Sequence, residues 1–162
     1  MQSQKGIKNL KERKMNRLVL TLLVLFATLT ISAQDEVLEK YSQMGDMNTT
    51  FVTKNMLESL PLDQFNVPGL SRMVERLESL KILVSRGDNA GKKMGTKLPG
   101  QLSGKGFKTI LTTKKDGKNI TVMQSKKDPT RVVMLVYQKP QAIAVSMQGD
   151  FSGIEEELEE LK

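Results

Sequence analysis

The sequence predicts an α+β domain with a mostly antiparallel sheet of five or six strands and helices packed on one face. Three observations lead to this prediction. Four runs with strand character, separated by short turn signals, fill residues 107–149 and read as an antiparallel meander. Apolar stripes at helical spacing precede and follow these runs. The chain shows no repeat with a period of about 20 to 50 residues, which excludes solenoids and propellers.

Residues 1–33 are set apart from the fold because they have the pattern of a secretory signal peptide. An apolar run over 18–31 follows a positive charge and ends in small residues. This run is too short for a hydrocarbon core of about 30 Å, which needs about 20 residues. We expect translation to start at Met15, so that 1–14 is a basic extension, and we expect cleavage after Ala33.

Residues 34–162 then form a single domain with nearly balanced charge, since it holds 19 basic and 17 acidic side chains. The net charge of +7 on the whole chain comes mostly from the removed segment, so we predict no nucleic-acid partner. The chain contains no Cys, and we therefore expect neither a disulfide nor a lipid anchor. No stop-transfer pattern follows the apolar run, so we also expect no transmembrane anchor after signal cleavage. The periplasm is the expected location, with full secretion as the alternative.

The N-terminal half is predicted to begin with a helix over 34–44, a strand over 48–53 and a helical turn over 55–60. The helix is indicated by apolar residues on one face: Val37, Leu38, Tyr41 and Met44. β-Branched and aromatic residues indicate the strand. A second amphipathic helix is expected over 69–79, and the apolar run that follows it predicts a strand over 80–84.

The segment 86–106 carries six glycines and Pro99, which interrupt a helical spacing of apolar residues. Because each interior Gly costs about 1 kcal/mol relative to Ala, we expect a weak helix over 88–98 followed by loop.

The meander consists of predicted strands over 107–113, 119–125, 131–137 and 142–148. Asp-Gly between the first two is a strong hairpin signal. The third strand is apolar on both faces and should lie centrally. The fourth has a face of small residues that should admit the C-terminal helix, which we expect to begin at a capping box formed by Ser152 and Glu155.

The absence of His and Cys excludes serine and cysteine nucleophiles that depend on His, zinc sites ligated by His, and thiolate redox centres. We expect no cofactor, no bound metal and no catalytic residues. The most distinctive feature is charge, because residues 85–140 hold 13 basic and three acidic side chains. This pattern indicates a candidate basic patch for an anionic partner in the envelope; its residues are Lys105, Lys108, Lys114, Lys115, Lys118, Lys126 and Lys127. The alternative is that these lysines keep turns and a sheet edge soluble.

Several segments together resemble the Bacteroides-type exported family catalogued as domain of unknown function 4252. They are Leu38-Glu-Lys-Tyr41, Thr50-Phe-Val-Thr-Lys-Asn-Met56, Leu77-Glu-Ser-Leu-Lys-Ile-Leu83 and Ala144-Val-Ser-Met-Gln-Gly-Asp-Phe151, after a signal that ends Ser32-Ala33-Gln34. These are packing and turn patterns, so the resemblance implies a fold and export and carries no catalytic residues.

The leading hypothesis is a non-enzymatic binding module of the cell envelope, which contacts another envelope protein or an anionic envelope component through its basic hairpins or a sheet edge. One alternative is a carrier that holds a lipid or another apolar ligand between sheet and helices. The other is an enzyme that uses carboxylates and lysines. An apolar cavity would favour the carrier, two close carboxylates with raised pKa the enzyme, and a solid core with an open sheet edge the binding module.

Overall fold

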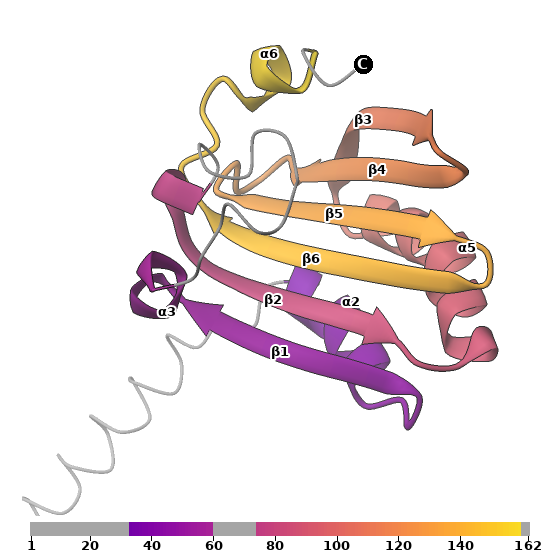
Figure 1. The fold of residues 1–162 in the computed structure, drawn as a ribbon. Helices are drawn as coiled ribbons and strands as arrows, with labels where there is room; N and C mark the ends of the chain where they lie inside the picture. Colours follow the sequence, from indigo (N-terminus) through magenta and orange to yellow (C-terminus); the bar gives the residue numbers. More distant parts are fainter. Residues whose placement is uncertain (1–32, 60–73, 160–162) are drawn as a thin grey trace, which may run out of the picture. The chain divides into compact units, whose positions relative to one another are not determined.

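Six strands form one antiparallel sheet in the order β1-β2-β6-β5-β4-β3 (Figure 1). The computed structural model describes residues 33–59 and 74–159, all within the unit Ala33–Lys162. The strands are β1 (Met47–Thr53), β2 (Leu77–Ser85), β3 (Phe107–Lys115), β4 (Lys118–Ser125), β5 (Arg131–Gln138) and β6 (Gln141–Gly149). The helices are α2 (Ala33–Ser42), α3 (Lys54–Glu58), α5 (Asp88–Gly104) and α6 (Ile154–Glu159). The α+β class, the antiparallel sheet and the C-terminal meander are confirmed.

The predicted extension and signal peptide lie outside the described residues, except for Ala33. Among the helices that are described, none is long and apolar enough to span a membrane.

The helix predicted over 69–79 was wrong at its C-terminal end, and its first residues, 69–73, lie outside the described part of the chain. Residues 74–76 are helical, but β2 already begins at Leu77. The pattern was misleading because Val74 and Leu77 lie three residues apart and belong to the same buried cluster, although Val74 is helical and Leu77 begins the strand. A β-bulge between Leu77 and Ser79, in the pairing of β2 with β6, also places Leu80 in that cluster.

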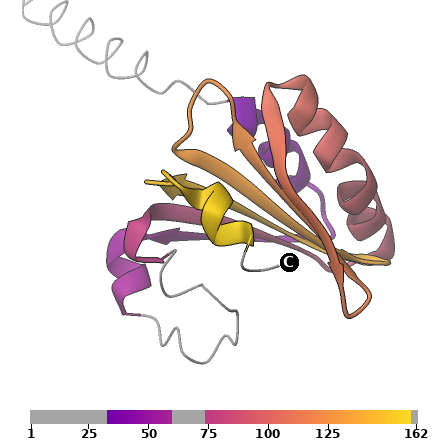
Figure 2. The same cartoon turned by 90° about the horizontal axis from the view of Figure 1, so that it is seen from above.

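The two longer helices, α2 and α5, pack on one face of the sheet, as predicted (Figure 2). Leu38 of α2, Leu83 of β2 and Met94 of α5 meet in this layer and are fully buried. The short helices α3 and α6 lie on the opposite face, which the prediction of one helical face did not include. Leu57 of α3 and Leu158 of α6 belong to the apolar cluster on that side.

Helix α5 is longer than predicted, since it continues through Pro99 to Gly104 where a loop was expected. Four residues at helical spacing anchor it to the sheet with at most 1 % of their surface exposed: Ala90, Met94, Leu98 and Leu102. Burial of this stripe outweighs the poor helix propensity of the glycines and the proline, because tertiary packing supplies most helical stability.

The small-residue face of β6 receives α5, so the prediction that the C-terminal helix packs there was wrong. Ala142 and Ala144 lie in the cluster beneath α5. Gly91 is required for this approach, since a Cβ on it would overlap the carbonyl oxygen of Pro140. Some glycines of α5 are therefore contact points that bring the helix close to the β5–β6 turn.

The predicted capping box at the start of α6 was also wrong. The Ser152 hydroxyl donates to Asp150 Oδ1 at 2.8 Å, and Glu155 forms an ion pair with Lys108 of β3, also at 2.8 Å. Ser152 thus binds back to the residue two positions before it, and Glu155 connects the C-terminal segment to the edge strand β3.

Candidate functional site

The two edges of the sheet differ in their protection against pairing with another chain. Edge strand β3 carries Lys108, Lys114 and Lys115, and its pairing with β4 is shifted between Thr109 and Leu111. Charges and bulges are the usual devices that keep an edge from accepting a further strand. Strand β1 has neither: its sequence, MNTTFVT, contains no charge and no proline, and its register with β2 is unbroken.

At alternate residues of β1, the backbone pairing groups point away from β2, and no other described strand uses them. The N–H of Arg86 donates to the carbonyl of Asp46 at 2.7 Å, and the register of β1 with β2 continues from this pair. Because antiparallel pairs alternate, the backbone groups of Thr50 face β2, whereas those of Thr49 and Phe51 face away from the sheet. Within the described part of the chain no further strand pairs with β1 on that side.

The side chain of Phe51 is unusually exposed for an aromatic residue, at 58 %. It lies on the same face as Met47, which belongs to the cluster beneath α2 and α5. Its partner in the register is Lys81, which forms a 2.9 Å ion pair with Glu39 of α2. The hydrogen bond from Lys81 holds the pKa of Glu39 below its ordinary range, so Glu39 stays charged and binds α2 to β2 beside the open edge.

The predicted basic patch is divided between two ends of the sheet. Lys114, Lys115 and Lys118 lie at the β3–β4 hairpin, whereas Lys126 and Lys127 lie in the β4–β5 turn at the other end of β4 (Figure 1). The length of β4, at about 3.3 Å for each residue, separates the two groups by roughly 25 Å. The lysines therefore do not form one continuous surface.

The other two candidate lysines have acidic partners. Lys105 lies 3.4 Å from Glu36, and Lys108 lies 2.8 Å from Glu155. Both pairs are about half exposed, so they are weak, but they lower the positive charge that these positions offer to a partner.

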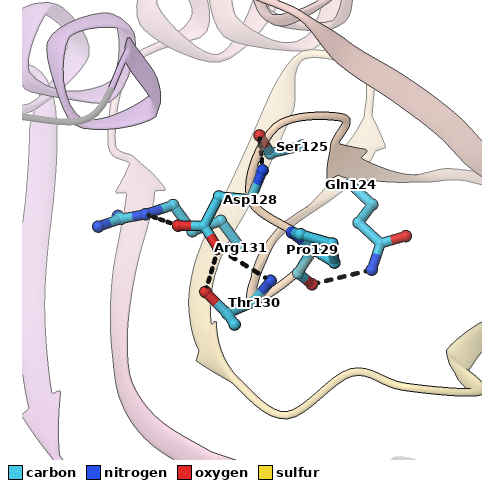
Figure 3. Close-up of polar contacts among 6 residues, drawn as sticks. All are labelled: Gln124, Ser125, Asp128, Pro129, Thr130 and Arg131. Atoms are coloured by element: carbon cyan, nitrogen blue, oxygen red, sulfur yellow. Dashed lines mark hydrogen bonds and ion pairs between the residues drawn. The ribbon is translucent and has the colours of Figure 1, made fainter.

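Asp128 organises the β4–β5 turn that carries Lys126 and Lys127 (Figure 3). Its carboxylate accepts hydrogen bonds from the hydroxyl and N–H of Thr130 and an ion-pair contact of 3.0 Å from Arg131 Nε. The Thr130 hydroxyl is the largest cause that lowers the pKa of Asp128. Gln124 adds a hydrogen bond of 2.9 Å to the carbonyl of Pro129, so the turn is held on both sides.

Among the described residues, Glu39, Asp128 and Asp150 are the carboxylates whose pKa is shifted, and hydrogen bonds lower it in each case. For Asp150 the backbone N–H of Ser152 is the main cause. No group of three or more potential metal ligands of the His, Cys, Asp or Glu type occurs among the described residues. These three carboxylates thus stabilise turns and ion pairs.

Sequence reasoning found β1 as a strand but missed its role as an open edge. The available signal was the lack of charge and proline in Met47–Thr53, which becomes meaningful once the strand order is known.

Comparison with known proteins gives one family. The sequence model of the family described as Domain of unknown function (DUF4252) matches residues 41–155, a range that includes all six strands and α5. No curated protein and no solved structure matches the chain. Because the matched range is well over half of the 162 residues, the chain belongs to the domain of unknown function 4252 family.

Proposed function

We propose that this protein is an exported, non-enzymatic binding module of the cell envelope that takes up an extended segment of a partner polypeptide along β1. The observation that carries the proposal is the contrast between the charged, bulged edge at β3 and the uncharged, regular edge at β1. A peptide that adds a strand gains main-chain hydrogen bonds from the sheet edge and specificity from the side chains beside it.

The groups that receive the partner are the outward backbone N–H and C=O of Thr49 and Phe51. Phe51 also offers an exposed aromatic ring beside the incoming strand. Cross-strand pairs of an aromatic with a β-branched or another aromatic residue contribute about 0.2–1 kcal/mol each. The partner segment is therefore an uncharged stretch rich in such residues.

Two other functions fit the structure less well. A carrier that encloses its ligand between sheet and helices needs a cavity inside that layer, but at the centre of the layer Leu38, Leu83 and Met94 have no exposed surface. An enzyme that uses a carboxylic acid needs a raised pKa, but the shifts of Glu39, Asp128 and Asp150 are all downward.

The test is photo-crosslinking in the cell that makes the protein. A photoreactive residue at position 49 should give one discrete adduct with an envelope polypeptide, while the same residue at position 112, on the other edge, should not. Mass spectrometry then identifies the crosslinked segment, and a synthetic peptide of that segment is added to the purified protein.

The peptide should slow amide hydrogen exchange at Thr49 and Phe51, and Thr49→Lys should weaken its binding at least tenfold. Thr112→Lys, the matched change on β3, should leave binding unchanged. Equal crosslinking from both edges, or peptide binding that ignores Thr49→Lys, would falsify the proposal. Export is tested separately by the N-terminal sequence of the protein recovered from the envelope fraction, which should begin at Gln34.

A further inference from the structure

A second candidate site lies between α2 and α5, apart from the β1 edge. A cleft of about 340 Å³ opens there, near the lower end of the size of small-molecule sites. Val37, Tyr41 and Met44 supply its apolar surface, and the first two are at most 5 % exposed. The cleft therefore has an apolar floor, in which Val37 and Tyr41 are largely buried and Met44 is partly buried.

Three lysines surround this apolar floor. Lys40 comes from α2, Lys93 from α5, and Lys105 directly follows α5. No carboxylate is among the described residues that line the cleft, but one of the three lysines, Lys105, makes a 3.4 Å ion pair with Glu36, in which both side chains are about half exposed. A concave surface edged by charges of one sign concentrates ions of the opposite sign.

A hydrogen bond across the cleft holds the two helices at a fixed separation. The hydroxyl of Tyr41 in α2 donates to Oε1 of Gln101 in α5 at 2.6 Å. Burial raises the pKa of Tyr41, so the hydroxyl keeps its proton and remains a donor at neutral pH. The cleft is thus already formed before any ligand enters.

We propose that this cleft binds a small organic anion with an apolar body, such as the carboxylate of a medium-length acyl chain. The carboxylate lies beside Lys40 and Lys93 and competes with Glu36 for Lys105, and the chain lies against Val37 and Met44. Both parts of the ligand are required, because the cationic rim and the apolar floor belong to the same cleft. The site is independent of the proposed function, since none of its residues belongs to β1.

Decanoate, used below its micelle concentration, is the probe, and binding is measured by calorimetry on the purified protein. Decanol keeps the chain without the charge, acetate keeps the charge without the chain, and inorganic phosphate tests for a simple anion site. Decanoate should bind at least tenfold more tightly than any of the three. Equal affinity for decanol or for phosphate would overturn the proposal.

The chain offers a matched pair of glycines to place the ligand. Gly104 lines the cleft and Gly100 does not, yet both belong to α5 and a Cβ on either meets no atom within 4 Å. Gly104→Leu should fill the cleft and weaken decanoate binding at least tenfold, whereas Gly100→Leu should leave it unchanged. Weaker decanoate binding by Gly100→Leu than by Gly104→Leu, or equal binding by both variants, would contradict the placement of the ligand in this cleft.

A second pair tests the charge. Lys93→Gln should weaken decanoate binding about threefold to tenfold and reduce its dependence on salt, because one cation of the rim is lost. Lys97→Gln removes an exposed lysine of the same helix that does not line the cleft, and it should have no effect. Equal effects of both changes would show a general charge effect and sink the proposed site. The Thr49→Lys variant should bind decanoate normally, which separates this result from that of the β1 edge.

Discussion

The backbone of Gly95 in α5 lies directly against the ring of Tyr137 in β5. A Cβ on Gly95 would overlap Cδ2 of that ring, far inside van der Waals contact. Together with Gly91, one helical turn earlier, this contact explains why a helix rich in glycine lies so near the sheet. It also separates the glycines of α5 into those that are needed for packing and those that are not.

Gly95→Ala should therefore destabilise the protein by about 1–3 kcal/mol, the usual range for overpacking. Gly100→Ala, where the added Cβ meets nothing, should stabilise it by about 0.5–1 kcal/mol through helix propensity. Urea unfolding midpoints measure both changes. In a Tyr137→Ala background the penalty at Gly95 should largely disappear, and its persistence there would show that the ring is not the cause.

The two neighbouring residues Thr49 and Thr50 should respond very differently to proline. Thr50→Pro removes an N–H that faces β2 and should cost about 3 kcal/mol or more. Thr49→Pro removes an N–H that faces away from the sheet and should cost less than about 1 kcal/mol. Thermal and urea unfolding measure the stability of the two variants. A larger loss of stability in Thr49→Pro than in Thr50→Pro would mean that the N–H of Thr49, and not that of Thr50, faces β2.

Ser85 should be more important for stability than an exposed serine. Its Oγ accepts a buried hydrogen bond of 2.9 Å from the N–H of Ala142, where β6 begins beside β2. Ser85→Ala leaves that buried N–H without its acceptor and should cost about 1–3 kcal/mol. Ser103→Ala, at an exposed position of α5, should change stability by less than about 0.5 kcal/mol. Equal unfolding free energies for the two variants would contradict this role.

Asp128 should make stability depend on pH on the acid side. Its folded pKa is below its ordinary value of 3.8, so its stabilising effect is present above that value and is lost as pH falls through the lowered pKa. Asp128→Asn should thus cost about 1 kcal/mol or less near neutral pH, since the carboxylate is partly exposed, and nothing in strong acid. Unfolding free energies of both proteins across pH test this.

The Thr130 hydroxyl is the main cause of that shift, which gives a second measurement. Thr130→Val should raise the pKa of Asp128 toward 3.8 in an NMR titration of the carboxyl carbon. An unchanged pKa in this variant would assign the shift to the backbone N–H of Thr130 and to Arg131 instead.

The two groups of lysines should act independently on any polyanion. Reversal of Lys114, Lys115 and Lys118 to Glu and reversal of Lys126 and Lys127 to Glu should each lower affinity for heparin. Their free-energy effects should add within about 0.5 kcal/mol, because sites more than about 10 Å apart rarely couple. A combined variant whose effect clearly departs from this sum would show that one polyanion segment bridges both groups.

The meander was predictable because its signals are local. Asp116-Gly117 adopts the positive φ angles that the hairpin needs, and Asp128 and Pro129 form the next turn. The alternation of Val132 and Val133 between the two faces of β5 also identified a central strand. Each of these features depends on residues that are near one another in the chain.

The remaining features depend on contacts that the sequence does not contain. The extent of α5 is set by the surface beneath Met94 and Leu102, and the bulge at Leu77 is set by pairing with β6. The open edge at β1 follows from strand order, and the cleft beside Tyr41 follows from the way two helices pack. The lysines of the predicted basic patch could be identified from the sequence. Their separation into two groups at opposite ends of the sheet could not, because it depends on how the strands are arranged.

The pairing of β2 with β6 joins segments that are far apart in the chain, since Leu77 lies opposite Gly149. The meander β3 to β6 closes only short loops, whereas this seam closes a much longer one that contains α5 and three strands, and long loops carry a larger entropic penalty. Helix α5 contacts both strands of this pair, β2 and β6, and it connects β2 to β3 at the far edge of the sheet. It therefore reduces the number of arrangements that the chain can sample before β2 meets β6. Folding should therefore be paced by closure of this seam.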